Sequence, residues 1–499
     1  MEIISRDPQI VELERWIERI WDTAVRLGLE PYPTHFEIVP ATIMYEFGSY
    51  GLPGRFAHWT HGRAYHQMKT MYDYGLNKIY ELVINSNPCY AFLMEANTPL
   101  ENKLVVAHVL AHSDFFRHNA YFQHTNRQMI ETASINAERI RHYEYDHGTL
   151  EVERFLDAVL SIEDHVELVT IPGLGELPEE RDERPRPRTT PYDDLFELDR
   201  RGGSGEPGGR GEEGGGRGRG GGGARREGEW HGAHLGRRRR FPREPQRDLL
   251  KFILEHAEDL EDWQRDIIAI VRQERLYFVP QLRTKTLNEG WSSLWHSRIL
   301  RELDLPEGEY TEFARLHASV AAPSRHQLNP YYVGMRMLEH IERRWENPSP
   351  QDRERLGLRG GEGRAKLFEI RELENDLSFM RTYLTKEVVE DLDLYIYAYE
   401  GGEWRIVEKN WEKVRDQIVR SLTSYGIPYI TVEDGDYRRA RELLLKHHFD
   451  GDELDLRYAE RTLRYVYQLW GRPVHLETVV DDKPVLLSYD GSRNTKTAL

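Results

Sequence analysis

The chain has 499 residues, of which 39% are hydrophobic and 11% aromatic, and a chain this long exceeds a single hydrophobic core. We therefore expect two or more domains. Its 68 basic and 85 acidic side chains give a net charge of −17, which disfavours binding to nucleic acid or to an anionic membrane unless a local basic patch overrides it.

The first predicted element is a helix that begins at Pro8. Asp7 precedes it as an N-cap, apolar residues recur at helical spacing, and Gly28 ends the pattern. The same stretch carries acidic residues where a secretion signal needs a basic start and an apolar run. No window of the chain approaches the roughly 18 apolar residues of a membrane span. We therefore expect a cytoplasmic protein without a membrane segment.

The next part of the chain changes character twice. Residues 32–66 are rich in Gly, Pro and aromatic residues, which predicts a packed irregular segment. Residues 81–85 (ELVIN) and 89–95 (CYAFLME) then predict two strands, with Ser86-Asn87-Pro88 as the turn between them. Helical periodicity follows and predicts helices at about 101–117, 128–145 and 150–166.

Residues 178–243 are dominated by Gly, Arg, Pro and Glu. Such a segment cannot bury enough apolar surface to offset its ordering entropy, so we expect a disordered insert. Arg/Gly-rich sequence can bind RNA by charge and stacking. This tract lacks interleaved aromatic residues over most of its length and contains several Glu. We therefore favour a solvated linker and do not expect nucleic-acid binding, although an RNA-associated role remains a weaker hypothesis.

Helical periodicity resumes at Asp248 and continues to about residue 390. Beyond residue 392 the pattern predicts two strands, a helix, a strand, two helices and two final strands. The sequence therefore predicts an α+β, mainly helical protein in four segments. These are 1–177 and 244–390 as two parts of one core, 178–243 as the insert, and 391–499 as a small C-terminal α+β domain.

One helix carries a pair of histidines suited to metal binding. His108 and His112 are four residues apart, so both imidazoles lie on one face and can reach a single ion. Asp114 falls on the opposite face and is a poor ligand candidate. Cys89 is the single cysteine, which excludes an intrachain disulfide and a thiolate-rich metal site. Histidine pairs at this spacing are more often packing or surface residues, so the pair alone does not establish a metal site.

Five stretches of the chain carry a family resemblance: HWTHGRAYH, ELVINSNPCYAFLMEAN, AHVLAHSDFF, DLLKFILEHAEDLEDWQRDIIAIVRQE and LNEGWSSLWH. Together they resemble the SpoVR family (stage V sporulation protein R-like). The resemblance implies a role in spore cortex formation in spore-formers, and in stress or stationary phase in other bacteria. It also implies functional association with a PrkA-like serine protein kinase and a von Willebrand-A-type protein. It implies no settled enzymatic reaction.

A second resemblance concerns the histidine pair. Residues 288–291 (NEGW) are similar to the helix of gluzincin metallopeptidases that supplies a glutamate ligand, which makes Glu289 the third ligand beside His108 and His112. The order of hairpin and histidine helix also fits a zincin-like N-terminal core. Two histidines and a carboxylate suit zinc, with iron or manganese as alternatives.

The chain departs from zincin peptidases at Val109, where those enzymes have a glutamate that acts as general base. Losing such a base slows catalysis by about 10²–10⁴-fold. Glu81 and Glu95 in the hairpin are the candidate substitutes. His296 lies seven residues after Glu289 on the same helix face, which favours a role as hydrogen-bond partner or proton donor rather than as a ligand.

Two main functional hypotheses stay open. The first is a divalent-metal site that serves a hydrolase-like reaction. The second is a non-enzymatic scaffold or regulator on a decayed metallopeptidase fold, which the absence of glutamate at position 109 favours. Among the histidines near residue 60, His58 is the best site candidate, whereas His61 and His66 read as structural or exposed.

Overall fold

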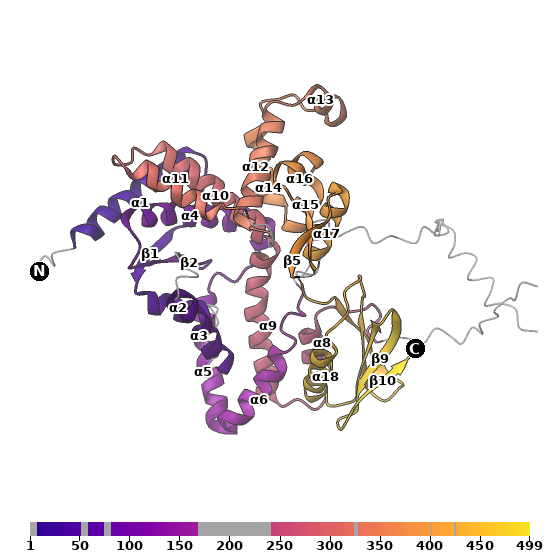
Figure 1. The fold of residues 1–499 in the computed structure, drawn as a ribbon. Coiled ribbons are helices and arrows are strands. Elements are labelled where there is room, and N and C mark those ends of the chain that lie inside the picture. Colours follow the sequence, from indigo (N-terminus) through magenta and orange to yellow (C-terminus); the bar gives the residue numbers. More distant parts are fainter. Residues whose placement is uncertain are drawn as a thin grey trace, which may run out of the picture. The chain divides into compact units, whose positions relative to one another are not determined.

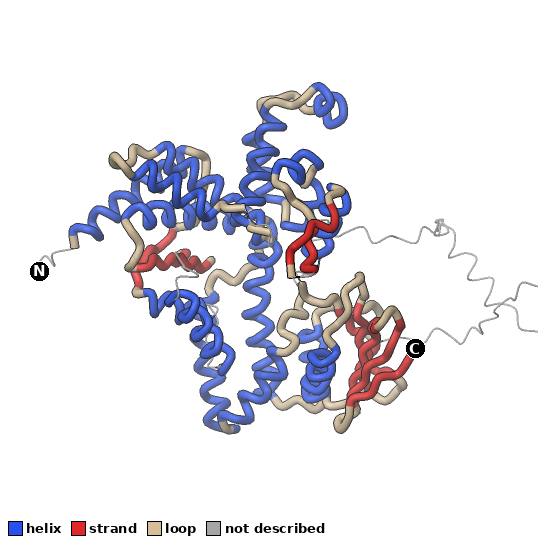
Figure 2. The backbone as a smooth tube through the Cα atoms, viewed as in Figure 1, coloured by secondary structure: helices blue, strands red, loops and turns tan. Residues whose placement is uncertain are grey.

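The computed structural model describes residues 7–50, 58–73, 81–167, 241–323, 328–400, 402–423 and 426–499. Helices predominate in this part of the chain, together with sheets of three, two and five strands (Figures 1 and 2). The expected mainly helical α+β character is therefore confirmed. The predicted insert lies outside the described residues except for 241–243. No helix in the described ranges is both long enough and apolar enough to cross a membrane.

The larger hydrophobic core is built around helix α4 (Pro99–His118), whose N-terminus is defined by a capping box between Thr98 and Glu101. Helices from both sides of the insert pack around it, so this core joins distant parts of the sequence. They are α1 (Pro8–Arg26), α10 (Lys285–Glu302), α11 (Glu309–Val320), α12 (Pro330–Glu346) and α14 (Gly363–Leu373).

Helix α10 is buried around most of its circumference, including Trp291 and Trp295. It approaches α12 at a pair of glycines. A Cβ added to Gly290 would lie 2.3 Å from the carbonyl carbon of Gly334, and one added to Gly334 would lie 2.2 Å from the carbonyl oxygen of Thr286. Real Cβ atoms do not approach so closely, so the crossing requires glycine in both helices.

A small sheet lies next to this core, with strand order β1-β3-β2. The predicted hairpin is confirmed, because β2 (Glu81–Ile84) and β3 (Cys89–Met94) pair in antiparallel register. The expectation of an irregular segment at 32–66 is wrong for its described residues. They form β1 (Thr34–Val39), α2 (Ala41–Tyr50) and the start of α3 (Trp59–Asp73). Strand β1 runs parallel to β3, and this pairing has no local sequence signal.

A second core joins α5 (Met129–His147), α6 (Thr149–Leu160), α8 (Leu249–His256) and α9 (Asp262–Arg283) to a C-terminal sheet and α18 (Leu456–Trp470). The sheet has the order β10-β9-β8-β7-β6, and only its β7–β8 pair is parallel among the described residues. Its strands are β6 (Ile430–Tyr437), β7 (Glu442–His447), β8 (Val474–Val480), β9 (Lys483–Tyr489) and β10 (Asn494–Ala498).

The expectation of two helices after β6 is wrong, because the first of them is strand β7. Its Leu443 and Leu445 pack in the second core, and its backbone pairs with β6 and β8. The remaining elements lie within residues 350–423, except for one short turn that follows α4. They are the single turn η1 (Ala120–Phe122), α13 (Pro350–Leu356), α15 (Asp376–Tyr383), α16 (Lys386–Asp391), the hairpin β4 (Ile396–Glu400) and β5 (Glu403–Glu408), and α17 (Trp411–Thr423).

Candidate metal centre

Helix α4 places His108 and His112 side by side inside the first core. Only 3% of His108 and 5% of His112 is exposed, and the centroids of their rings lie 4.6 Å apart. The facing helix is α10, which carries Glu289 and Asn288. The expected i, i+4 face of α4 is thus turned toward the helix that carries the expected third residue.

The three side chains converge. Glu289 Oε2 lies 3.5 Å from Nε2 of His108 and 3.5 Å from Nε2 of His112. All three candidate ligand atoms lie within 4.8 Å of one another, and this is the one group of its kind that the described residues contain. Glu289 Oε2 is buried, and its contacts with the two imidazoles, at 3.5 Å, are longer than ordinary hydrogen bonds. A buried carboxylate oxygen without a hydrogen bond is unfavourable unless something else neutralises it.

The distances suit an ion between the three atoms. Zinc ligands lie about 2.0–2.2 Å from the metal, which puts two ligands of a tetrahedral site about 3.3–3.5 Å apart. A direct hydrogen bond between imidazole and carboxylate would instead bring nitrogen and oxygen to about 2.7–2.9 Å. The spacing around Glu289 therefore fits three ligands of one ion.

The second nitrogen of each imidazole is held by a neighbour on α10. His112 Nδ1 lies 2.9 Å from the amide oxygen of Asn288, which can only accept, so Nδ1 donates and Nε2 carries the lone pair. His108 Nδ1 lies 2.9 Å from Nδ1 of His296. Metal-binding histidines characteristically use their other ring nitrogen for such a contact.

Electrostatics within the cluster favour an ionised carboxylate. Burial by itself raises the pKa of the Glu289 carboxyl, but His108 and His112 outweigh that effect and hold the pKa below its usual range. Burial lowers the pKa of His296 well below its usual value, and the neighbouring imidazoles of His108 and His317 lower it further. His296 is therefore a neutral imidazole inside the core, where 0% of its surface is exposed.

Comparison with known proteins shows the family of the chain. Residues 7–427 match the family described as "SpoVR like protein", and residues 428–481 match the "SpoVR-like C-terminal domain". The chain belongs to the SpoVR-like family. It is 29% identical over 502 residues to the uncharacterized protein YcgB of Escherichia coli (strain K12), a match that covers 95% of this chain and 93% of that protein. No solved structure matches the chain.

Of the two candidate base substitutes in this SpoVR-like chain, Glu95 does not join the cluster. Val109 is fully buried among apolar side chains of the first core. Glu95 is exposed at the end of β3, and its carboxylate is not part of the converging group. Glu81 begins β2, but its side chain lies outside the described residues. His296, expected as a partner rather than a ligand, contacts His108.

Other predicted positions have structural partners. Asp114 is fully buried and pairs with Arg371, and it also accepts from the indole of Trp291. His58 lies 3.1 Å from the Asp157 carboxylate on α6, and the same oxygen accepts from the indole of Trp59. These contacts hold helices together and lie apart from the converging ligands.

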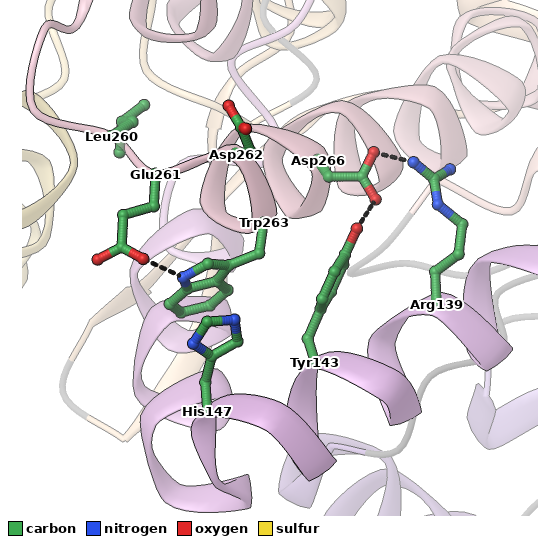
Figure 3. Close-up of a pocket in the computed structure, with 8 residues that line it drawn as sticks. All are labelled: Arg139, Tyr143, His147, Leu260, Glu261, Asp262, Trp263 and Asp266. Atoms are coloured by element: carbon green, nitrogen blue, oxygen red, sulfur yellow. Dashed lines mark hydrogen bonds and ion pairs between the residues drawn. The ribbon is translucent and has the colours of Figure 1, made fainter.

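A surface pocket between α5 and α9 is also separate from the cluster (Figure 3). His147 stacks on Trp263 with ring centroids 4.7 Å apart, and Glu261 accepts from that indole at 3.0 Å. On the other side Asp266 accepts from Tyr143 and pairs with Arg139. Most polar groups of the pocket are thus paired with each other, and neither His108, His112 nor Glu289 lines the pocket.

Sequence reasoning missed two residues of the cluster. Asn288 directly precedes Glu289 and could have been noticed as a second polar residue on the same turn. His317 lies on α11, with its Nδ1 2.9 Å from Nε2 of His296. No spacing in the sequence relates His317 to the other histidines, because the contact depends on how α11 packs against α10.

Proposed function

We propose that His108, His112 and Glu289 bind one divalent transition metal ion, and that this SpoVR-like protein uses it in a hydrolase-like reaction. The observation that carries the proposal is the placement of both Nε2 atoms 3.5 Å from one buried oxygen of Glu289. Two imidazoles and a carboxylate suit zinc, and they also accept iron or manganese.

The protein's own groups would define the geometry of this centre. Asn288 keeps His112 in the tautomer whose Nε2 carries the lone pair, and His296 contacts the remote nitrogen of His108. Glu289 contributes a negative charge that the two imidazoles stabilise. A divalent ion held by these groups would supply Lewis acidity, which polarises a carbonyl or phosphoryl oxygen and lowers the pKa of water to about 7.

Peptide hydrolysis by the usual zincin route is not the reaction we propose. Val109 occupies the place of the general base and is buried in apolar surroundings, so no carboxylate acts from that position. A divergent zincin-like core remains part of the proposal. Its support is the order of elements, in which a hairpin leads into the histidine helix α4 and a later helix, α10, supplies the glutamate.

The rival proposal is a non-enzymatic scaffold or regulator, and the same buried Val109 favours it. A metal ion would then hold α4 to α10 without catalysing a reaction. A cytoplasmic role in sporulation or stress, and association with a PrkA-like kinase and a von Willebrand-A-type protein, are proposals that rest on the family resemblance alone.

Metal analysis tests the proposed centre. After mild chelation and reloading with zinc, the wild type should retain about one ion per chain. His108→Ala and Glu289→Gln should each weaken zinc affinity by ~10²-fold or more, because a three-ligand set loses one ligand. The control is His142→Ala, which removes an exposed histidine of α5. A wild type that binds no zinc, manganese or iron under any loading condition would refute the centre.

A further inference from the structure

Three imidazoles from three helices form a continuous hydrogen-bonded chain that starts at the candidate ligand His108. His108 Nδ1 lies 2.9 Å from His296 Nδ1, and His296 Nε2 lies 2.9 Å from His317 Nδ1. In both pairs the ring centroids are 5.1 Å apart. His296 is fully buried, whereas His317 is only partly buried on α11. The hydrogen-bonded row of imidazoles therefore runs from the candidate metal centre toward the surface.

The hydrogen bonds of this chain can run in only two directions. A neutral imidazole has one N–H donor and one acceptor nitrogen, so once one ring is oriented its neighbours must follow. If His317 donates inward, His296 donates to His108, and the proton of His108 sits on Nε2, where it blocks coordination. If His108 donates outward, His296 donates to His317, and Nε2 of His108 presents its lone pair toward Glu289.

We propose that His317 is a positioning residue of the metal centre. By accepting the Nε2–H of His296, it stabilises the outward direction and so holds His108 in its coordinating tautomer. This inference rests on the proposed function and extends it by two residues. Because linkage is reciprocal, an ion at the centre also sets which nitrogen of His317 carries the proton, near the surface of α11.

Substitutions at His317 test the inference because a partly exposed position tolerates change. His317→Leu removes the acceptor and leaves a buried N–H of His296 without its partner whenever the chain runs outward. Its Co²⁺ affinity, measured by competition with a chelator, should fall ~10–100-fold, as is typical when a metal ligand loses its supporting hydrogen bond. His317→Gln restores an acceptor, so its affinity and its Co²⁺ absorption spectrum should return close to those of the wild type.

His340→Leu is the matched control. His340 is a half-buried histidine of α12 that pairs with Glu387, so its loss removes a similar side chain without touching the imidazole chain. If the wild type and His317→Leu bind Co²⁺ equally tightly with the same spectrum, the positioning role is wrong while the metal centre stands. Equal losses in His317→Leu and His317→Gln would also overturn it, since they indicate a packing role. A wild type that binds no Co²⁺ removes both proposals.

Discussion

At the scale of single residues, two partly buried carboxyls show how differently their surroundings shift a pKa. At Glu289, two imidazoles overcome the effect of burial and keep the pKa low. At Glu163, in the turn after α6, burial dominates and raises the pKa to about 7, because Arg275 offsets it only in part and Asp164 adds to it. Glu289 is thus ionised within the fold, whereas Glu163 carries a proton up to neutral pH.

Glu163 gives the protein a predictable pH dependence. Between pH 4.5 and 7 the unfolded chain releases this proton before the folded protein does, so stability falls as pH rises through that window. Glu163→Gln should remove the effect and be more stable than the wild type above pH 7, by on the order of 1–3 kcal/mol. Chemical denaturation at pH 5 and pH 8 measures this. The control is Glu18→Gln, at an exposed position, whose stability should equal that of the wild type at both pH 5 and pH 8. If Glu163→Gln also matches the wild type at both pH values, the raised pKa of Glu163 is wrong.

At the scale of elements, the crossing of α10 and α12 positions the glutamate ligand. Gly290 directly follows Glu289, and its backbone lies against Gly334. Any side chain at this point must push the two helices apart, and α10 also contacts α4. The separation between Glu289 and the two histidines therefore depends on a glycine that has no chemical role of its own.

Gly290→Ala should accordingly lower both stability and metal affinity. Overpacking typically costs ~1–3 kcal/mol, which should appear as a lower Tm, and the displaced α10 should weaken zinc binding. Gly62→Ala, in helix α3, is the control, because a Cβ added there meets no atom within 4 Å. Alanine at an exposed helix position should leave the stability unchanged or raise it by about 1 kcal/mol. A Gly290→Ala variant with unchanged Tm and zinc affinity would contradict the packing argument.

At the scale of the whole molecule, the described residues on the two sides of the predicted insert are joined directly. The backbone N–H of Leu249 donates to the carbonyl of His165, and that of Glu167 donates to the Asp248 carboxylate. Both cores also take residues from each side. The insert is therefore not needed to bring the two sides together.

Replacing residues 178–239 with a short Gly/Ser linker should leave Tm nearly unchanged. Loop closure entropy varies slowly with length, by about 0.6 kcal/mol for each halving, so a shorter connection is if anything slightly stabilising. Differential scanning calorimetry of the deletion variant and the full chain checks the prediction. A fall in Tm of many degrees would mean that this segment packs on the folded protein.

The sequence by itself determined what depends on short-range order. The i, i+4 spacing of His108 and His112, the Asp7 cap that begins α1, and the turn between β2 and β3 are all local, so periodicity and turn chemistry predicted them. Glu289 came from a four-residue resemblance, not from spacing. Tertiary structure decided the rest, because β1, β7 and the contacts of His296 with His108 and His317 depend on partners distant in sequence, which no local pattern encodes.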